Sequence, residues 1–125
     1  MQAFDLDDVS LDLPDTVFNT VGGSEPDIIV CGEVLEHLSN PGWFLTRLRR
    51  QYPGVPVLVT VPNAFSEAAI KWLAKGKENV NIDHVAWYSP HTLRVLLQRA
   101  GYTTGDLYYY GGTDPLAEGL IVVAE

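Results

Sequence analysis

Two short segments of the sequence bring together side chains that can move a proton. Asp83 and His84 are adjacent, and a carboxylate beside an imidazole raises the pKa of the ring and orients it. Such a base removes the proton of a hydroxyl group before that oxygen attacks an electrophile. Glu33, Glu36 and His37 add two carboxylates and a second imidazole. We expect a general base at His84 with Asp83, and His37 as a second base or a pocket residue; a structural part for each histidine stays open.

The Glu-x-x-Glu-His spacing that begins at Glu33 resembles part of a metal site, because carboxylate and imidazole groups both ligate metals. One such cluster without a second is a weak signal. The chain has a single cysteine, which excludes a cysteine-based zinc site and an internal disulfide. We therefore expect no metal site.

Short apolar runs alternate with helical patterns along the chain. Strands are expected at residues 2–6, 27–32, 55–61, 107–110 and 120–124, and helices at residues 40–52, 65–75 and 89–100. The runs at 27–32 and 55–61 are rich in β-branched residues, as in strands that are buried on both faces. The alternation predicts an α/β domain with a mostly parallel sheet, in which residues 1–125 form one domain.

Each expected helix has a start signal or an apolar stripe. Asn40-Pro41 and Ser89-Pro90 combine a capping residue with proline at the first helical position. The residues expected to face inward are Phe44, Leu45, Leu48 and Tyr52 in the first helix, Ala69, Ile70 and Leu73 in the second, and Leu93, Leu96, Leu97 and Ala100 in the third.

Candidate binding residues follow the two central strands. Ligands of open α/β sheets bind beyond the carboxyl ends of the strands, where Cys31, Gly32 and Glu33 end one strand and Asn63 follows the next. Gly32 lets a ligand approach the backbone, and Cys31 is expected to be a buried small residue rather than a nucleophile. Asn63 would hydrogen-bond a substrate hydroxyl group or serve only in a turn.

Aromatic residues near the second histidine have two interpretations. Trp87 and Tyr88 would form an apolar wall for a substrate, or would belong to the core beneath the helix that starts at Ser89. The run Tyr108-Tyr109-Tyr110 is expected to form a strand with one exposed face.

The charge is strongly acidic and uneven. The net charge is −8, and residues 1–46 contain acidic residues but no lysine or arginine. Such a chain repels phosphate backbones and anionic lipids, so we expect no nucleic-acid or membrane partner. No apolar run is long enough to span a membrane, and we expect a cytoplasmic protein. The acidic half is either a solvated surface or a crevice for a cationic or hydroxyl-rich ligand.

The string Asp-Ile-Ile-Val-Cys-Gly-Glu-Val-Leu-Glu-His-Leu-Ser-Asn-Pro, residues 27–41, resembles the fourth-strand motif of class I S-adenosylmethionine-dependent methyltransferases. It is most similar to the small-molecule branch that includes quinone-biosynthesis methyltransferases. Residues 58–65 resemble the fifth strand and the turn after it in this family, and residues 83–90 its substrate-side segment. Residues 92–102 resemble its last helix, and Asp5 the acidic residue that ends its third strand.

This resemblance implies a Rossmann-like sheet of strand order 3-2-1-4-5-7-6, mostly parallel with an antiparallel C-terminal strand and helices on both faces. It implies S-adenosylmethionine as cofactor and a small molecule as methyl acceptor, with oxygen as the favoured acceptor atom. Asp5 would bond the adenine amino group and the backbone at Leu6 would meet the ring. The cofactor pocket would also contain Cys31, Gly32, Glu33 and His37.

The glycine-rich turn that follows the first strand of the family is not found in this sequence. We therefore expect residues 1–125 to be the C-terminal half to two thirds of a methyltransferase domain, inactive by itself. The strand at 27–32 would then have a free edge, covered by residues 1–13 or by a second copy in a homodimer. The alternatives are a non-catalytic interaction module, half of a split enzyme, or an unrelated α/β regulator.

Overall fold

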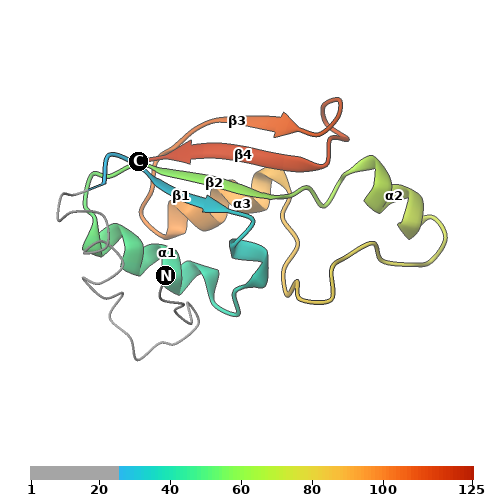
Figure 1. Ribbon diagram of the computed structural model, residues 1–125, viewed down its shortest axis with the longest axis horizontal. Coiled ribbons are helices and arrows are strands. Elements are labelled where there is room, and N and C mark those ends of the chain that lie inside the picture. The colour runs from blue at the N-terminus through green and yellow to red at the C-terminus, as the bar shows by residue number, and fades with distance from the viewer. Residues whose placement is uncertain (1–25) are drawn as a thin grey trace.

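The computed structural model describes residues 26–125, which form a four-stranded sheet with helices (Figure 1). The strands are β1 (Ile29–Gly32), β2 (Val57–Pro62), β3 (Thr104–Tyr110) and β4 (Gly119–Ala124). The helices are the short 3-10 turn η3 (Leu35–His37), α1 (Pro41–Gln51), α2 (Glu67–Leu73) and α3 (Pro90–Arg99). The strand expected at residues 2–6, with Asp5 and Leu6, lies outside the described residues.

The sheet has the order β1-β2-β4-β3. β1 and β2 are parallel, and β4 runs antiparallel to both β2 and β3. Three strands therefore share one direction and the C-terminal strand opposes them. This arrangement confirms the predicted α/β class, and it reproduces the order 4-5-7-6 that the resemblance implied.

The helix signals in the sequence work as expected. The side chain of Asn40 accepts a 3.1 Å hydrogen bond from the backbone N–H of Trp43, and Pro41 is the first residue of α1. Ser89 and Thr92 form a reciprocal capping box at the start of α3. No helix within residues 26–125 is long and apolar enough to cross a membrane.

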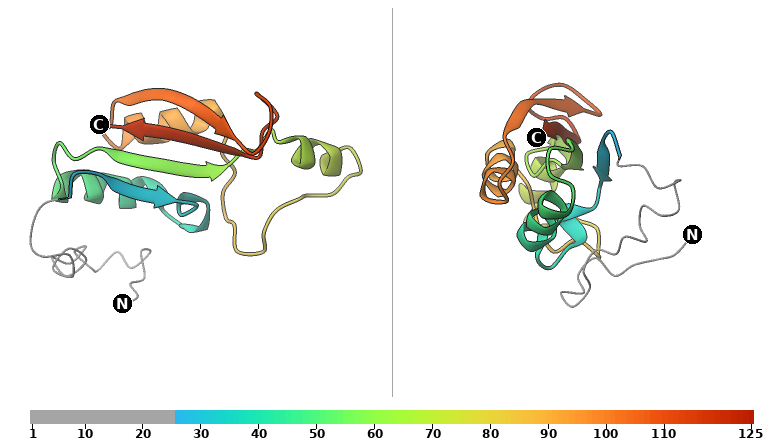
Figure 2. Two further views of the ribbon diagram at one scale, coloured as in Figure 1. Left: turned by 45° about the horizontal axis from the view of Figure 1, so that its top comes forward. Right: turned by 90° about the vertical axis from the view of Figure 1, so that its left-hand side faces the viewer.

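α1 and α3 pack on the same face of the sheet, as the end-on view in Figure 2 shows. The alternate residues of the strands that point to this face are buried, namely Cys31, Val57, Val59, Val61, Leu120, Val122 and Ala124. Phe44, Leu45, Leu48, Leu93 and Leu97 meet them from the two helices. The sequence analysis predicted helices on both faces of the sheet. Within the described residues, α1 and α3 cover one of these faces.

The opposite face of the sheet carries exposed side chains. Val30 is 64% exposed and Tyr108 is 61% exposed. The prediction that the strand at 27–32 is buried on both faces is therefore wrong for the described residues. Among the described strands, β1 lies at the edge of the sheet with β2 as its one neighbour, and only its inward residues meet the helices.

α2 corrects a second prediction. Only Ala69 of this helix is buried, whereas Ile70 and Leu73 are exposed. The helix lies beyond the end of the sheet rather than against its face (Figure 1), so its apolar stripe has no sheet to cover.

Candidate functional site

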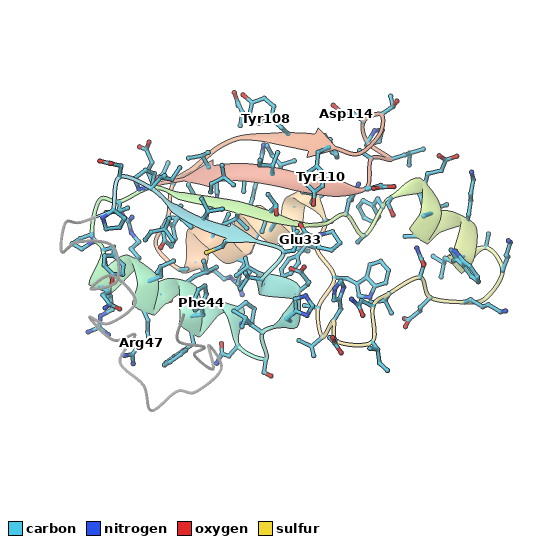
Figure 3. All side chains as sticks on the ribbon, in the orientation of Figure 1. Glu33, Phe44, Arg47, Tyr108, Tyr110 and Asp114 are labelled. Carbon is cyan, nitrogen blue, oxygen red and sulfur yellow. The ribbon has the colours of Figure 1, made fainter. Side chains whose placement is uncertain are left out.

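The carboxyl end of β1 is joined to its neighbours through Glu33. Its backbone N–H donates to the carbonyl oxygen of Thr60 (3.0 Å) and to Thr60 Oγ1 (3.1 Å). Its Oε1 accepts hydrogen bonds from Thr60 Oγ1 (2.9 Å) and from the Tyr110 hydroxyl (2.6 Å), which points toward it in Figure 3. One carboxylate thus ties together the ends of β1, β2 and β3.

Glu33 is also the only non-glycine residue with positive φ among residues 26–125, at 53°. This left-handed conformation is uncommon for a residue with a side chain, and it turns the chain sharply from β1 into η3. The turn brings Glu36 and His37 to the rim of the sheet directly after the strand.

The segment after α2 returns to η3 and brings His84 to the same place. Val85 N–H donates to the carbonyl oxygen of Glu36 (2.8 Å), and the Tyr88 hydroxyl donates to that of Leu35 (3.1 Å). The rings of His37 and His84 meet edge to face with their centroids 4.6 Å apart. The fold therefore unites the two segments that the sequence singled out for proton transfer.

Glu36 is the buried member of this group. It is 1% exposed, and neither oxygen of its carboxylate has a hydrogen-bond partner within residues 26–125. Oε1 lies 3.7 Å from Nε2 of His37, which is a longer separation than a hydrogen bond. Glu36, His37 and His84 each offer one atom that could ligate a metal. These three atoms lie within 4.8 Å of one another.

Electrostatics in this group follow from burial. Desolvation raises the pKa of Glu36, and the charge of Glu33 raises it further, while the polar backbone of Glu36 itself and the two nearby histidines act in the opposite direction. Burial, helped by the charge of Glu36, raises the pKa of Tyr88 to about 12. Tyr88 is therefore a neutral hydrogen-bond donor at physiological pH.

The structure does not pair Asp83 with His84. Asp83 is exposed, and within residues 26–125 no hydrogen bond or ion pair joins it to the histidine. The neighbours of His84 are His37 and Glu36 instead. The adjacency that suggested an Asp–His base is thus replaced by a contact between distant segments.

The side chains of Asn63 and Tyr88 make hydrogen bonds to the backbone of the protein and have a structural role. The Asn63 amide donates to the carbonyl oxygens of Pro115 and Ala117, both at 2.9 Å, and accepts from Phe65 N–H at 3.0 Å. These bonds use both amide hydrogens and the amide oxygen, and the residue is 2% exposed, which leaves nothing to offer a substrate. Tyr88 is buried with its hydroxyl engaged, so of the expected aromatic wall only Trp87 is exposed.

The remaining candidates end β1. Cys31 is buried on the helix-covered face, and burial raises the pKa of its thiol to about 11. This matches its expected character as a small apolar residue and gives it no reach toward a ligand. Gly32 is exposed, and a Cβ there would make only an ordinary 3.6 Å contact with Thr60 Oγ1.

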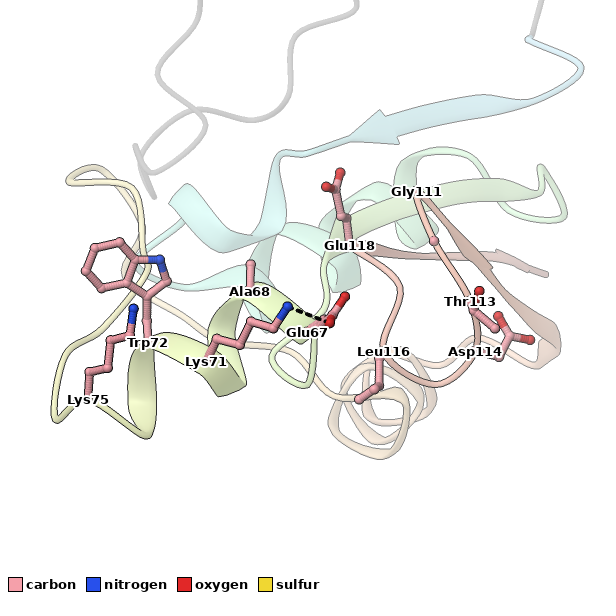
Figure 4. A pocket seen from close by; sticks show the side chains of 11 residues that line it. Glu67, Ala68, Lys71, Trp72, Lys75, Gly111, Thr113, Asp114, Leu116 and Glu118 are labelled. Carbon is pink, nitrogen blue, oxygen red and sulfur yellow. Dashed lines mark ion pairs between the residues drawn. The ribbon is translucent and has the colours of Figure 1, made fainter.

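Two cavities flank α2. The larger, about 660 Å³, lies between α2 and the β3–β4 connection and is lined by Glu67, Lys71, Trp72, Gly111 and Glu118 among others (Figure 4). The smaller, about 330 Å³, is lined mainly by apolar residues that include Phe65, Leu73 and Trp87. Trp87 therefore does line a cavity. Neither cavity includes Glu33, Glu36 or His84.

The sequence indicated neither Thr60 nor Tyr110 as a site residue. Thr60 is the one hydroxyl-bearing residue in the apolar run from 55 to 61, and this break in an otherwise hydrophobic strand was the available signal. Tyr110 comes from a strand far along the chain, and only the fold brings it to Glu33.

Comparison with known proteins identifies the fold. A sequence profile of methyltransferase domains matches residues 3–105, so the chain belongs to the methyltransferase-domain family. Among curated protein sequences, none matches the chain.

Solved structures agree with this assignment. The chain superposes on an S-adenosylmethionine-dependent methyltransferase from Mesorhizobium loti with a TM-score of 0.63 and 16% identity, covering 98% of this chain and 67% of that one. The small RNA methyltransferase HEN1 gives a TM-score of 0.62 and 19% identity over 78% of this chain and 14% of that one. Magnesium protoporphyrin IX methyltransferase from Synechocystis PCC 6803 with bound SAH gives 0.61 and 12%, over 98% and 49%.

These likenesses establish a shared fold. The chain spans 14% of the length of HEN1, and 63% and 45% of the length of the S-adenosylmethionine-dependent methyltransferases from Archaeoglobus fulgidus and Aquifex aeolicus. In each case the chain is less than two thirds of its relative.

Proposed function

We propose that this chain is part of an S-adenosylmethionine-dependent methyltransferase that methylates an oxygen atom of a small molecule. The observation that carries the proposal is the rim at the carboxyl end of β1, where Gly32, Glu33 and η3 follow the strand inside a methyltransferase-type sheet. Ligands of such sheets bind at this edge.

The described residues fit one side of a cofactor site. Gly32 is exposed and has no side chain, so a flat ring meets bare backbone there. The exposed His37 stands at the same rim. Asp5 and Leu6 would add their contacts to the adenine ring from outside the described residues. When bound, S-adenosylmethionine supplies the electrophilic methyl group, and the protein supplies alignment.

His84 is the base that we assign to the acceptor hydroxyl group. It is half-buried and lies beside His37 and Glu36, and the carboxylate of Glu36 makes no hydrogen bond to any of the described residues. Asp83, which the sequence placed in this role, is exposed and is left out of the assignment.

We further propose that this chain supplies only part of the cofactor site, because the glycine-rich turn of the family is not found in its sequence. The test is an amide NMR titration with S-adenosylhomocysteine up to several millimolar. We expect progressive shifts at Gly32, Glu33 and Val34 without saturation at micromolar ligand.

A matched pair of variants locates the binding. Gly32→Ala and Gly42→Ala each add a Cβ whose nearest neighbouring atom lies at 3.6 Å, so both should fold. Gly32→Ala should weaken the shifts several-fold and Gly42→Ala should leave them unchanged. Shifts confined to the cavities beside α2, or none at all, would contradict the cofactor site; saturation at micromolar ligand would contradict its incompleteness.

A second candidate function is a non-catalytic interaction module, or half of a split enzyme, that pairs through the edge of β1. The observation in its favour is that β1 ends the sheet in the described part of the chain, with Val30 exposed. Ile29 and Glu33 direct their N–H groups to β2, so Val30 directs its own to the open side. An open edge of this kind is a template for pairing with another strand.

Sedimentation measurements separate the two functions. Val30→Pro removes an outward donor without touching the ladder to β2, and Val30→Thr keeps the donor as a control. If pairing through β1 operates, the chain should form dimers that Val30→Pro dissociates and Val30→Thr preserves. A monomer at high concentration would contradict pairing of β1 with a second copy of the chain.

A further inference from the structure

Exposed apolar side chains gather on one part of the molecule, residues 65–87, which we call the α2 lobe. Within residues 26–125, fourteen large hydrophobic residues are exposed, and eight of them belong to this lobe. Leu73 is 69% exposed, Ile82 95% and Val85 63%. The lobe consists of α2 and the loop after it, and it lies beyond the end of the sheet, where α1 and α3 do not cover it (Figures 1 and 2). Apolar surface concentrated in this way marks a place of contact.

The lysines of the chain lie on the same lobe. All three, Lys71, Lys75 and Lys77, fall within seven residues, and residues 68–77 contain no acidic side chain. The ammonium groups of Lys75 and Lys77 lie 5.5 Å and 5.8 Å from the centre of the exposed Trp72 ring. Figure 4 shows Lys75 beside this ring. The lobe therefore presents an indole ring with two cations next to bare aliphatic side chains.

The lobe also contains acidic residues, at Glu67, Glu78 and Asp83. Glu67 is held in a 2.6 Å ion pair with Lys71, and the other two lie in the loop after α2. Charges in solution act over about 10 Å at 0.1 M salt, which is also about the length of a seven-residue helix. A surface that contacts α2 thus meets its lysines and not the net charge of −8, on which the expectation of no membrane partner was based.

We propose that the α2 lobe docks on a bilayer surface that contains anionic lipids. Lysine stems lie along apolar surface while their ammonium groups reach the lipid phosphates, and tryptophan favours the level of the headgroups. Leu73 and Ile82 enter the boundary between headgroups and acyl chains.

The lysines favour this occupant over the other two. On an apolar protein surface their ammonium groups would lose water without gaining a partner. A second copy of the lobe would bring like charges together.

Vesicle flotation tests the proposal. It goes beyond the proposed methyltransferase function, and binding is measured without cofactor or acceptor. The chain is mixed with vesicles made of equal parts of phosphatidylcholine and phosphatidylglycerol. We expect binding at low salt, at least about fivefold weaker binding to pure phosphatidylcholine, and weaker binding in 1 M salt, where charges act over only about 3 Å.

A matched pair of double variants locates the charged part of the contact. Lys75→Glu with Lys77→Glu should weaken vesicle binding at least tenfold. Arg94→Glu with Arg99→Glu, at exposed positions of α3, makes the same change in net charge and should have little effect. Equal losses in both double variants would mean that net charge alone governs binding, which would overturn docking through the lobe.

A second pair tests the apolar part. Ile82→Ser changes a side chain that is 95% exposed, so it should fold, and it should weaken vesicle binding several-fold. Tyr108→Ser, at a 61% exposed position of β3, should leave binding unchanged. Absence of binding to anionic vesicles would refute the proposal. So would self-association in sedimentation that Ile82→Ser abolishes without any vesicle binding, because the lobe would then be an interface between copies.

Discussion

The Tyr110 hydroxyl donates a 2.6 Å hydrogen bond to Oε1 of Glu33, so the end of β3 is joined to the end of β1 across the strands between them. The two residues lie 77 positions apart in the sequence. The contact fixes the rim where we place the cofactor, and it makes the shape of that rim depend on the packing of the Tyr110 ring.

The ring of Tyr110 lies over Gly119, where a Cβ would collide with the ring atoms. We predict that Gly119→Ala forces the ring away from Glu33 and lowers the free energy of unfolding by about 1–3 kcal/mol, as overpacking does. Urea denaturation measures this loss. Gly42→Ala, which meets only an ordinary contact, serves as the control.

A double-mutant cycle identifies the cause. In a Tyr110→Ala background the ring is absent and the collision is removed. Gly119→Ala should therefore lower the free energy of unfolding much less in that background. Equal costs in both backgrounds would show that the ring does not occupy the place described.

The second prediction concerns the ionisation of Tyr110. Burial, followed by the hydrogen bond to Glu33 and its charge, raises the pKa of Tyr110 to about 12 from a reference value of 10.0. Between these values the folded state holds a proton that the unfolded state has lost. The contribution of the Tyr110 hydroxyl to the free energy of unfolding is therefore fully present below pH 10, and it falls as the pH rises toward 12.

Absorbance of the phenolate measures this ionisation, with Tyr110→Phe identifying the contribution of the residue. Glu33→Gln should lower the pKa of Tyr110, because it removes the neighbouring negative charge. A pKa unaltered by Glu33→Gln would leave burial as the sole cause.

Much of the fold was predictable, because local signals decided it. Asn40-Pro41 and Ser89-Pro90 gave the starts of α1 and α3, and the apolar runs gave β2 and β4. The errors arose where burial depends on distant neighbours. Ile70 and Leu73 have helical spacing, yet α2 lies off the end of the sheet and leaves them exposed.

In the candidate site, too, the features set by local sequence were predicted correctly, and the contacts between distant segments were not. Sequence order placed Glu33 and Gly32 at the end of a strand, and the structure agrees. It paired His84 with its neighbour Asp83, whereas the loop that returns to η3 places His84 beside His37. Contacts between segments so far apart are set by tertiary packing and leave no trace in residue spacing.

Asn63 is predicted to be essential for stability rather than for substrate binding. Asn63→Ala removes three side-chain hydrogen bonds and leaves the carbonyl oxygens of Pro115 and Ala117 without this donor. We expect a loss of about 2–4 kcal/mol in the free energy of unfolding, since each unpaired buried group costs about 1–3 kcal/mol. Asn79→Ala, at an exposed position, should change it by less than about 0.5 kcal/mol.

Asn63→Asp tests the direction of these bonds. An aspartate still accepts from Phe65 N–H but cannot donate to the two carbonyl oxygens. It should be nearly as destabilising as alanine. An aspartate variant as stable as the wild type would contradict the donor role of the amide.

Cys31 is predicted to resist thiol reagents in the folded protein. Burial raises the pKa of the Cys31 thiol from 9.0 to about 11, so the reactive thiolate is scarce near pH 8. A chromogenic disulfide reagent should react slowly in buffer and rapidly in urea. Because the folded state keeps its proton longer, the stability contributed by this thiol falls as the pH rises from 9 to 11. Rapid labelling in buffer would show that β1 opens readily.

Calorimetric titration of the chain with S-adenosylmethionine tests the central claim most directly. If the carboxyl end of β1 is one side of a cofactor site that another segment completes, binding should be detectable with a Kd near the millimolar range, about −4 kcal/mol. Absence of binding at several millimolar would contradict the cofactor site, and micromolar affinity would contradict the view that the chain carries only part of it.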